Sequence, residues 1–284
     1  MHDQPLAYFD PEFLESDDAR PMRIIAEYLE PLRRFREQNI QDTVVFFGSA
    51  RVHSRVAAQR ALKRLRSGKH GTDYSVALKR SRKALEWSRY YEDARDLAHR
   101  LTTWSLSLET LRHRFVVCSG GGPGIMEAAN RGAHEAGGKT IGLNIRLPFE
   151  QGANRYITEG LHLEFHYFFM RKFWFAYLAK ALVIFPGGFG TLDEMFEILT
   201  LAQTNKLSKQ LLVIIYGREY WDAILDLRPM AEWGAISPKD LDLLQWVDSP
   251  AQAFDCLRDH LMTHHLVPET PQETQAPGIA KTRG

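Results

Sequence analysis

Hydrophobic positions along the chain form two alternating patterns. Five short runs are continuously apolar and rich in β-branched or aromatic residues, which is typical of strands buried on both faces of a parallel sheet. Between them, apolar residues recur every three or four positions, which predicts helices. The predicted strands are 43–47, 115–118, 140–145, 181–185 and 211–215, with a further candidate at 161–165, and the predicted helices are 84–111, 125–136, 167–180, 192–206, 220–233 and 251–264. This alternation predicts an α/β fold, a Rossmann-like doubly wound parallel sheet flanked by helices.

The segments outside this alternation predict the remaining organisation. Residues 21–38 have helical spacing, but Pro31 interrupts it, which predicts a kink or two short helices. The connection after the first strand is far longer than most strand-to-helix loops, so residues 52–84 are interpreted as an insertion with short amphipathic helices. We therefore expect an N-terminal arm and helix (1–42), one Rossmann-like domain (43–265) and a disordered tail (266–284).

The composition excludes several classes of protein. With 44% hydrophobic and 25% charged residues, the chain has the composition of an ordinary soluble globular protein. Its two cysteines do not form a C-x-x-C pair, which favours a reducing compartment. No apolar run is long enough for a membrane span, and the first residues lack the pattern of a signal peptide. We expect a cytoplasmic protein with no membrane partner, no metal site and no cofactor.

The charge is distributed unevenly, although the formal net charge is only +1. Between Arg51 and Arg89, twelve Lys and Arg residues face only Asp73 and Glu86, which gives this stretch a charge of +10. We interpret it as a solvated or acid-paired segment, a lid or docking arm that the acidic N-terminal arm balances. Nucleic-acid binding is the disfavoured alternative, because few aromatic residues interleave the cations.

Two glycine-rich turns carry the first candidate chemistry. Residues 119–124 (SGGGPG) and 186–190 (PGGFG) each follow a predicted strand and open a predicted helix. Bare backbone N–H groups at a helix start suit a phosphate. Neither turn is a Walker P-loop, and neither matches G-x-G-x-x-G, so ATP hydrolysis and ordinary NAD binding are disfavoured. The alternative is that the glycines merely turn the chain between strand and helix.

Charged residues near the second turn admit two interpretations. Thr191 and Glu194 have the spacing of a capping box, in which Thr191 is the N-cap and Glu194 folds back onto its amide. Alternatively, Glu194 is a carboxylate that faces a ribose and stabilises positive charge at the anomeric carbon. Arg171 and Lys172 interrupt a strongly aromatic helix, where buried cations require anionic partners such as a phosphate or Glu194.

These motifs together resemble the LOG (Lonely Guy) family, often labelled "lysine decarboxylase-like". The resemblance rests on Gly48-Ser49-Ala50-Arg51, the turn at 119–126, the Arg171-Lys172 pair and the P-G-G-x-G-T-x-x-E sequence at 186–194, and it covers roughly 43–263. It implies a nucleoside 5′-monophosphate phosphoribohydrolase, an AMP nucleosidase-like enzyme that releases the free base and ribose 5-phosphate from AMP or a cytokinin ribotide. It also implies a homodimer or a higher homo-oligomer.

The resemblance assigns roles to particular residues. Arg171 and Glu194 match the family's essential Arg and Glu. The substrate-binding positions that it implies are Ser49, Gly121, Gly122, Gly124, Met126, Lys172, Gly187, Gly188, Gly190 and Thr191. The chain departs from short plant-type members by its arm, by its basic insertion and by Phe168, where they usually have Met. No lysine marks a pyridoxal phosphate site, so we reject the decarboxylase activity.

The expected mechanism follows from these assignments. The glycine turns hold the 5′-phosphate, and Glu194 stabilises an oxocarbenium-like transition state. Arg171 either neutralises the phosphate or orients Glu194, and both roles stay open at this point. A nucleotide-sensing module that binds without catalysis, or a nucleic-acid binder acting through the insertion, are the alternatives to a hydrolase.

Overall fold

A computed structural model describes residues 5–68, 73–147, 152–204 and 210–266 of the chain. Its centre is one parallel sheet with the strand order β4-β3-β2-β1-β5-β6-β7. The strands are β1 (Thr43–Phe47), β2 (Val116–Ser119), β3 (Thr140–Ile145), β4 (His162–Phe165), β5 (Ala179–Ile184), β6 (Leu212–Tyr216) and β7 (Leu244–Val247). The doubly wound Rossmann-like α/β fold expected from the sequence is confirmed.

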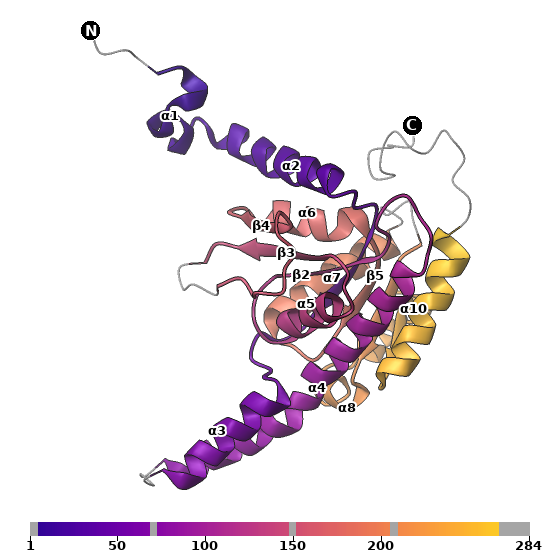
Figure 1. The fold of residues 1–284 in the computed structure, drawn as a ribbon. Helices are drawn as coiled ribbons and strands as arrows, with labels where there is room; N and C mark the ends of the chain where they lie inside the picture. Colours follow the sequence, from indigo (N-terminus) through magenta and orange to yellow (C-terminus); the bar gives the residue numbers. More distant parts are fainter. Residues whose placement is uncertain (1–4, 69–72, 148–151, 205–209, 267–284) are drawn as a thin grey trace.

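Continuous apolar runs form the inner strands because both faces of the sheet are covered (Figure 1). In β1, Val44 and Phe46 pack against one helical layer, and Val45 and Phe47 pack against the other. The first layer contains α4 (Tyr74–Leu106), α5 (Ile125–Glu135) and α10 (Pro250–His265). The second contains α2 (Arg20–Glu37), α6 (Phe168–Leu178), α7 (Phe189–Gln203) and α8 (Arg218–Trp221). The side chains of each strand therefore alternate between two apolar cores.

Of the two outcomes predicted at Pro31, the two short helices are wrong, because α2 continues through this residue as one helix. A proline lacks the N–H that would bond to the carbonyl four residues earlier, here that of Glu27. The indole N–H of Trp174 in α6 donates to this carbonyl at 2.9 Å, and Pro31 itself is buried. Packing against α6 thus satisfies the group that the proline leaves without a partner.

The insertion forms one long helical hairpin rather than several short helices. α3 (Arg55–Ser67) packs against the first half of α4, and the two project from the body of the molecule (Figure 1). α4 has 33 residues, so it joins the insertion and the helix predicted at 84–111 into one element. The N-terminal arm, with η1 (Ala7–Phe9) and α1 (Pro11–Glu15), lies at the opposite end of the molecule (Figure 1). The arm therefore does not balance the charge of the insertion within one chain.

The C-terminal third differs most from the sequence expectations. The helix predicted at 220–233 is two short helices, α8 and α9 (Arg228–Glu232), because Pro229 favours the start of a new helix. The short 3₁₀ helix η2 (Pro238–Leu243) and the edge strand β7 were not predicted. The tail expected to be disordered lies, from residue 267 onward, outside the described residues.

Candidate functional site

Three loops meet at the carboxyl edge of the sheet, where the order of strands reverses. β1 lies between β2 and β5, and the chain leaves it toward β2 on one side and returns to β5 on the other. The backbone N–H of Ser49, after β1, donates to Pro186 O, after β5, at 3.0 Å. The carbonyl of Ser49 accepts from Ile125 N–H, at the start of α5, at 3.1 Å. Ligands of doubly wound sheets bind at such switch points, so this edge is the candidate site.

The first glycine turn is held tightly by its surroundings. Gly121 and Gly124 have φ angles of +72° and +73°, which favour glycine. The side-chain amide of Asn154 donates to the carbonyls of Gly121 and Gly122 at 3.0 and 3.1 Å. Ser119 Oγ accepts from Gly121 N–H at 3.0 Å. The turn is therefore a fixed support for the start of α5, which has no side-chain cap.

The second glycine turn opens α7, and the capping-box interpretation of this region is wrong. The N-cap is Gly188, and α7 begins at Phe189 without a side-chain cap. Thr191 is therefore the third residue of the helix, and it is buried together with Glu194. A Cβ atom placed on Gly188 or Gly190 would meet nothing within 4 Å. The uncapped, positively polarised start of α7 is thus accessible to an anion.

Arg171 and Glu194, from neighbouring helices, form a buried ion pair. Arg171 Nη2 lies 3.3 Å from Glu194 Oε1, and the two side chains are 16% and 7% exposed. Burial raises the pKa of Glu194 above its ordinary value, although Arg171 and Lys172 act in the opposite direction. Arg171 also lies over the ring of Phe175, and its Nε has no hydrogen-bond partner among the described residues. The pair therefore combines a buried carboxylate with a cation that has one N–H group without a hydrogen-bond partner among the described residues.

Lys172 lies beside this pair but has other partners. Its Nζ is 2.9 Å from Asp193 Oδ1 and 3.0 Å from Glu197 Oε2. Burial by itself would lower the pKa of Lys172, but hydrogen bonds and attraction from the two carboxylates raise it above its ordinary value. The predicted anion-binding role of Lys172 therefore requires it to leave these carboxylates.

The remaining predicted residues lie along the same edge. Ser49 is half-buried and accepts from Arg51 N–H at 3.1 Å. Met126 is the second residue of α5, and its sulfur covers Gly120, where a Cβ would come within 2.7 Å. Gly187 packs closely against Thr191, and its carbonyl accepts from Tyr220 Oη at 2.8 Å. All twelve predicted site residues thus lie on or next to the three loops and the α6–α7 pair.

The sequence analysis did not identify the polar residues that support the first turn. Asn130, buried in α5, accepts from Ser119 Oγ at 2.7 Å and from Asn154 Nδ2 at 2.9 Å. It also donates to Ile141 O at 3.1 Å. One signal in the sequence could have identified Asn130. It is a polar residue on the apolar side of a helix, among Ile125, Ala128, Ala129 and Ala133. Asn154 had no comparable signal, because it lies in a loop 33 residues from Gly121.

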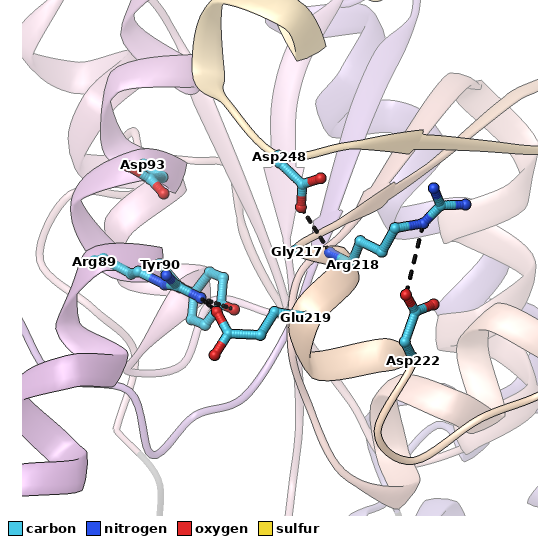
Figure 2. Close-up of a pocket in the computed structure, with 8 residues that line it drawn as sticks. All are labelled: Arg89, Tyr90, Asp93, Gly217, Arg218, Glu219, Asp222 and Asp248. Carbon is cyan, nitrogen blue, oxygen red and sulfur yellow. Dashed lines mark hydrogen bonds and ion pairs between the residues drawn. The ribbon is translucent and has the colours of Figure 1, made fainter.

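A separate hollow lies at the ends of β6 and β7 (Figure 2). Arg89 of α4 pairs there with Glu219 at 2.5 Å, and Arg218 pairs with Asp222 at 3.8 Å. The backbone N–H of Arg218 donates to Asp248 at 2.8 Å. Because its charges largely pair with one another, this hollow serves to join α4 to α8 and is not the candidate site.

Parts of the chain are similar to known proteins. Residues 126–257 match a family model described as "Possible lysine decarboxylase". LOG6 of Arabidopsis thaliana, a probable cytokinin riboside 5′-monophosphate phosphoribohydrolase, is 29% identical over 177 residues, which are 62% of this chain and 83% of LOG6. LOG3 of the same plant, a cytokinin riboside 5′-monophosphate phosphoribohydrolase, is 26% identical over 184 residues, which are 63% of this chain and 80% of LOG3.

One solved structure with a similar arrangement is the molybdenum cofactor carrier protein of Chlamydomonas reinhardtii. It is 18% identical, with a TM-score of 0.43, and the match covers 78% of this chain and 99% of that one. None of the described helices is long and apolar enough to cross a membrane.

Proposed function

We propose that the chain, which is similar to LOG proteins, hydrolyses the N-glycosidic bond of a purine nucleoside 5′-monophosphate. The substrate is AMP or a cytokinin ribotide, and the products are the free base and ribose 5-phosphate. The observation that carries the proposal is the buried Arg171–Glu194 pair beside the open start of α7.

The proposed phosphate position is the start of α7. Gly188 and Gly190 leave space there for phosphate oxygens, and the first-turn amides of the helix have no side-chain cap. Backbone N–H groups and the helix dipole both favour an anion at this place. A phosphate held there fixes the ribose above the carboxyl edge of the sheet, within reach of α6 and α7.

Glu194 is the proposed catalytic carboxylate. Cleavage of the N-glycosidic bond develops positive charge on the ribose, and a nearby carboxylate stabilises that charge most strongly in a water-poor setting. Glu194 is buried, and its raised pKa fits a group that is also able to direct an attacking water. As the pH is lowered, the carboxylate becomes protonated and kcat falls. Because the pKa of Glu194 is raised, this fall should begin at a higher pH than it would for an ordinary glutamate.

The contacts of Arg171 support both roles that the sequence left open for it, which are orienting Glu194 and neutralising the phosphate. One guanidinium nitrogen contacts Glu194, which orients the carboxylate in the absence of substrate. Nε is buried and has no hydrogen-bond partner among the described residues, so it is the proposed donor to a substrate phosphate once the side chain turns toward the site. A lysine decarboxylase would instead need a lysine whose pKa is lowered for Schiff-base chemistry, whereas that of Lys172 is raised.

A panel of nucleoside monophosphates tests the proposal. Purified protein is incubated with AMP, GMP, CMP and isopentenyladenosine monophosphate, and free base and ribose 5-phosphate are quantified. We expect release of adenine or isopentenyladenine. Glu194→Gln should lower kcat by about 10²- to 10⁴-fold, the usual contribution of a general acid or base. Tight AMP binding without turnover would instead support the sensing module.

Asp42 provides a matched control for Glu194. Its carboxylate is also buried and pairs with Arg114 at 2.8 Å, but it precedes β1 and therefore lies at the amino edge of the sheet. Asp42→Asn should lower the free energy of unfolding and leave kcat unchanged. Equal loss of kcat in both variants would mean that the effect of Glu194→Gln is structural.

We also propose that the protein is a homo-oligomer. Met22, Ile25 and Leu29 on α2 and Phe168 and Phe169 on α6 are 45–55% exposed. These two helices contact each other, so their exposed apolar side chains belong to neighbouring elements. Light scattering after size-exclusion chromatography should give at least twice the mass of one chain, 32.6 kDa.

A further inference from the structure

The projecting hairpin carries cations that the fold does not use. Here the basic hairpin means α3 together with residues 74–89 of α4. Eight of its cations, all exposed, have no carboxylate within ion-pair distance among the described residues: Arg55, Arg60, Lys63, Arg64, Arg66, Lys79, Arg80 and Arg82. Within the described part of the hairpin, only Lys83 and Arg89 form ion pairs, with Glu86 and Glu219. The concentration of unpaired charge points to an anionic partner.

The cations occupy matching positions on the two helices. Arg60, Lys63 and Arg64 have a spacing of three and four residues on α3, and Lys79, Arg82 and Lys83 have the same spacing on α4. Like charges at this spacing repel and lower helix stability. The hairpin nevertheless keeps its apolar residues Ala58 and Leu62 buried. Each helix therefore has one stripe that serves packing and another whose charge destabilises the isolated hairpin.

The base of the hairpin is fixed to the body of the protein. Arg89 pairs with Glu219 of α8 (Figure 2), and the rings of Trp87 and Tyr220 meet edge-to-face with centroids 5.3 Å apart. Tyr90 lies against Gly217, where a Cβ would come within 2.7 Å of the ring. The basic stripes thus have a defined position relative to the sheet.

The surroundings of the cations select one class of partner. Val56 and Val76 are the only large apolar side chains that the described part of the hairpin exposes, which is too few for the apolar face of a membrane-surface helix. Its aromatic residues are half-buried or buried, so bases of a single strand find no stacking platform. The acidic N-terminal arm lies at the opposite end of the molecule. A regular array of phosphates fits these observations best.

We propose that the basic hairpin binds the phosphate backbone of a nucleic-acid duplex without reading its base sequence. α3 has 13 residues and is about 20 Å long at 1.5 Å per residue. Duplex DNA carries one negative charge per about 1.7 Å of axis, so this length faces several phosphates. The interaction is independent of the nucleotide site, and neither requires the other.

Fluorescence anisotropy with the full chain and labelled duplexes tests the proposal. Two DNA duplexes of unrelated sequence and one RNA duplex are titrated between about 50 and 200 mM salt. We expect similar affinity for both DNA sequences and a linear fall of log affinity with log salt concentration. Replacing Arg60, Arg64, Arg80 and Arg82 with Ala should weaken binding at least about tenfold and make the salt slope shallower by up to about 3.6, at roughly 0.9 per lost phosphate contact.

The control removes the same amount of charge elsewhere. Arg33, Arg36, Arg100 and Arg112 are exposed and lie outside the hairpin, so their replacement with Ala should leave duplex affinity within about threefold. AMP hydrolysis should be unchanged in both quadruple variants, which also shows that both fold. The proposal is overturned by absence of duplex binding at low salt, by equal losses in the two variants, by binding of phosphatidylserine vesicles alone, or by a hairpin variant that loses self-association but keeps duplex affinity.

Discussion

The two glycine-rich turns are similar in sequence, but their glycines have different surroundings. In the turn after β2, a Cβ on Gly121 would lie 2.2 Å from Asn144 Oδ1, and one on Gly124 would lie 2.3 Å from Ser49 O. Gly121 and Gly124 both have φ angles in the left-handed region. In the turn after β5, a Cβ on Gly188 or Gly190 would meet no atom within 4 Å.

This difference separates two reasons for a glycine in a phosphate-binding turn. The first turn needs glycine because other parts of the chain approach its backbone closely. Gly188 and Gly190 have no such neighbours, so their missing side chains leave an open surface at the start of α7. Substitutions in the first turn should therefore act on folding, and substitutions at these two positions should act on the ligand.

Gly124→Ala should have the largest effect. Strain at a positive φ costs about 1–3 kcal/mol, and crowding against the Ser49 backbone adds about 1–3 kcal/mol. We expect the free energy of unfolding to fall by about 2–6 kcal/mol in urea denaturation. Gly137→Ala is the matched control, because Gly137 also has a positive φ, +80°, but a Cβ there meets nothing within 4 Å. Equal losses in the two variants would show that crowding does not contribute.

Gly190→Ala should leave the fold intact and impair the reaction. Gly190 is the second residue of α7, where Ala stabilises a helix by up to about 1 kcal/mol. Its methyl group would occupy space proposed for phosphate oxygens, so we expect kcat/KM for AMP to fall about tenfold, equivalent to about 1.4 kcal/mol. Unchanged kcat/KM would place the phosphate elsewhere.

The sequence predicted the strands well because each inner strand is a local apolar run. The bounds of β1 were correct to the residue, and β4 formed at the candidate position. The start of α7 was not predictable in the same way. Thr191 and Glu194 have the local spacing of a capping box, but the chain leaves β5 in a direction that starts the helix at Phe189. A local motif cannot specify the position and direction in which the chain leaves the preceding strand.

The supporting contacts of the site were also beyond local patterns. Asn154 reaches the first turn from a loop whose sequence has no periodicity, and its bonds link positions more than 30 residues apart. The charge of the insertion was visible in the sequence. That most of its cations have no acidic partner among the described residues became visible only once the arm was placed at the far end of the molecule (Figure 1). Sequence therefore identified the chemical groups, and topology decided which of them meet.

Asn154→Ala should have a smaller effect on the first turn than Gly124→Ala. It removes the donor to Gly121 O, Gly122 O and Asn130 Oδ1. Asn154 is half-exposed, so water replaces part of what is lost, and we expect a decrease of about 1 kcal/mol in the free energy of unfolding. Thermal denaturation measures it. A loss as large as that of Gly124→Ala would mean that the hydrogen bonds, and not the close approach of the backbone, determine the shape of the turn.

The smallest expected effect concerns the charge on Glu194, one turn beyond the open glycines of α7. Burial raises its folded-state pKa above the ordinary 4.5, so the folded protein holds this proton more tightly than the unfolded chain does. Between 4.5 and the raised pKa, the free energy of unfolding therefore falls as the pH rises. Glu194→Gln lacks this proton, so its stability relative to the wild type should increase across that window and stay constant on either side.

Urea denaturation of both proteins from about pH 4 to pH 8 measures this difference. Gly190→Ala retains Glu194, so its stability should run parallel to that of the wild type at every pH. A difference between wild type and Glu194→Gln that is independent of pH would mean that the attraction of Arg171 balances burial. A difference that favours the wild type as the pH rises would mean that Arg171 outweighs burial. The second turn would then resemble the first in one respect: residues beside it, here the Arg171–Glu194 pair, would stabilise the fold. The expected direction instead means that ionised Glu194 costs stability in the free protein, which is the property of a group held ready for a cationic transition state.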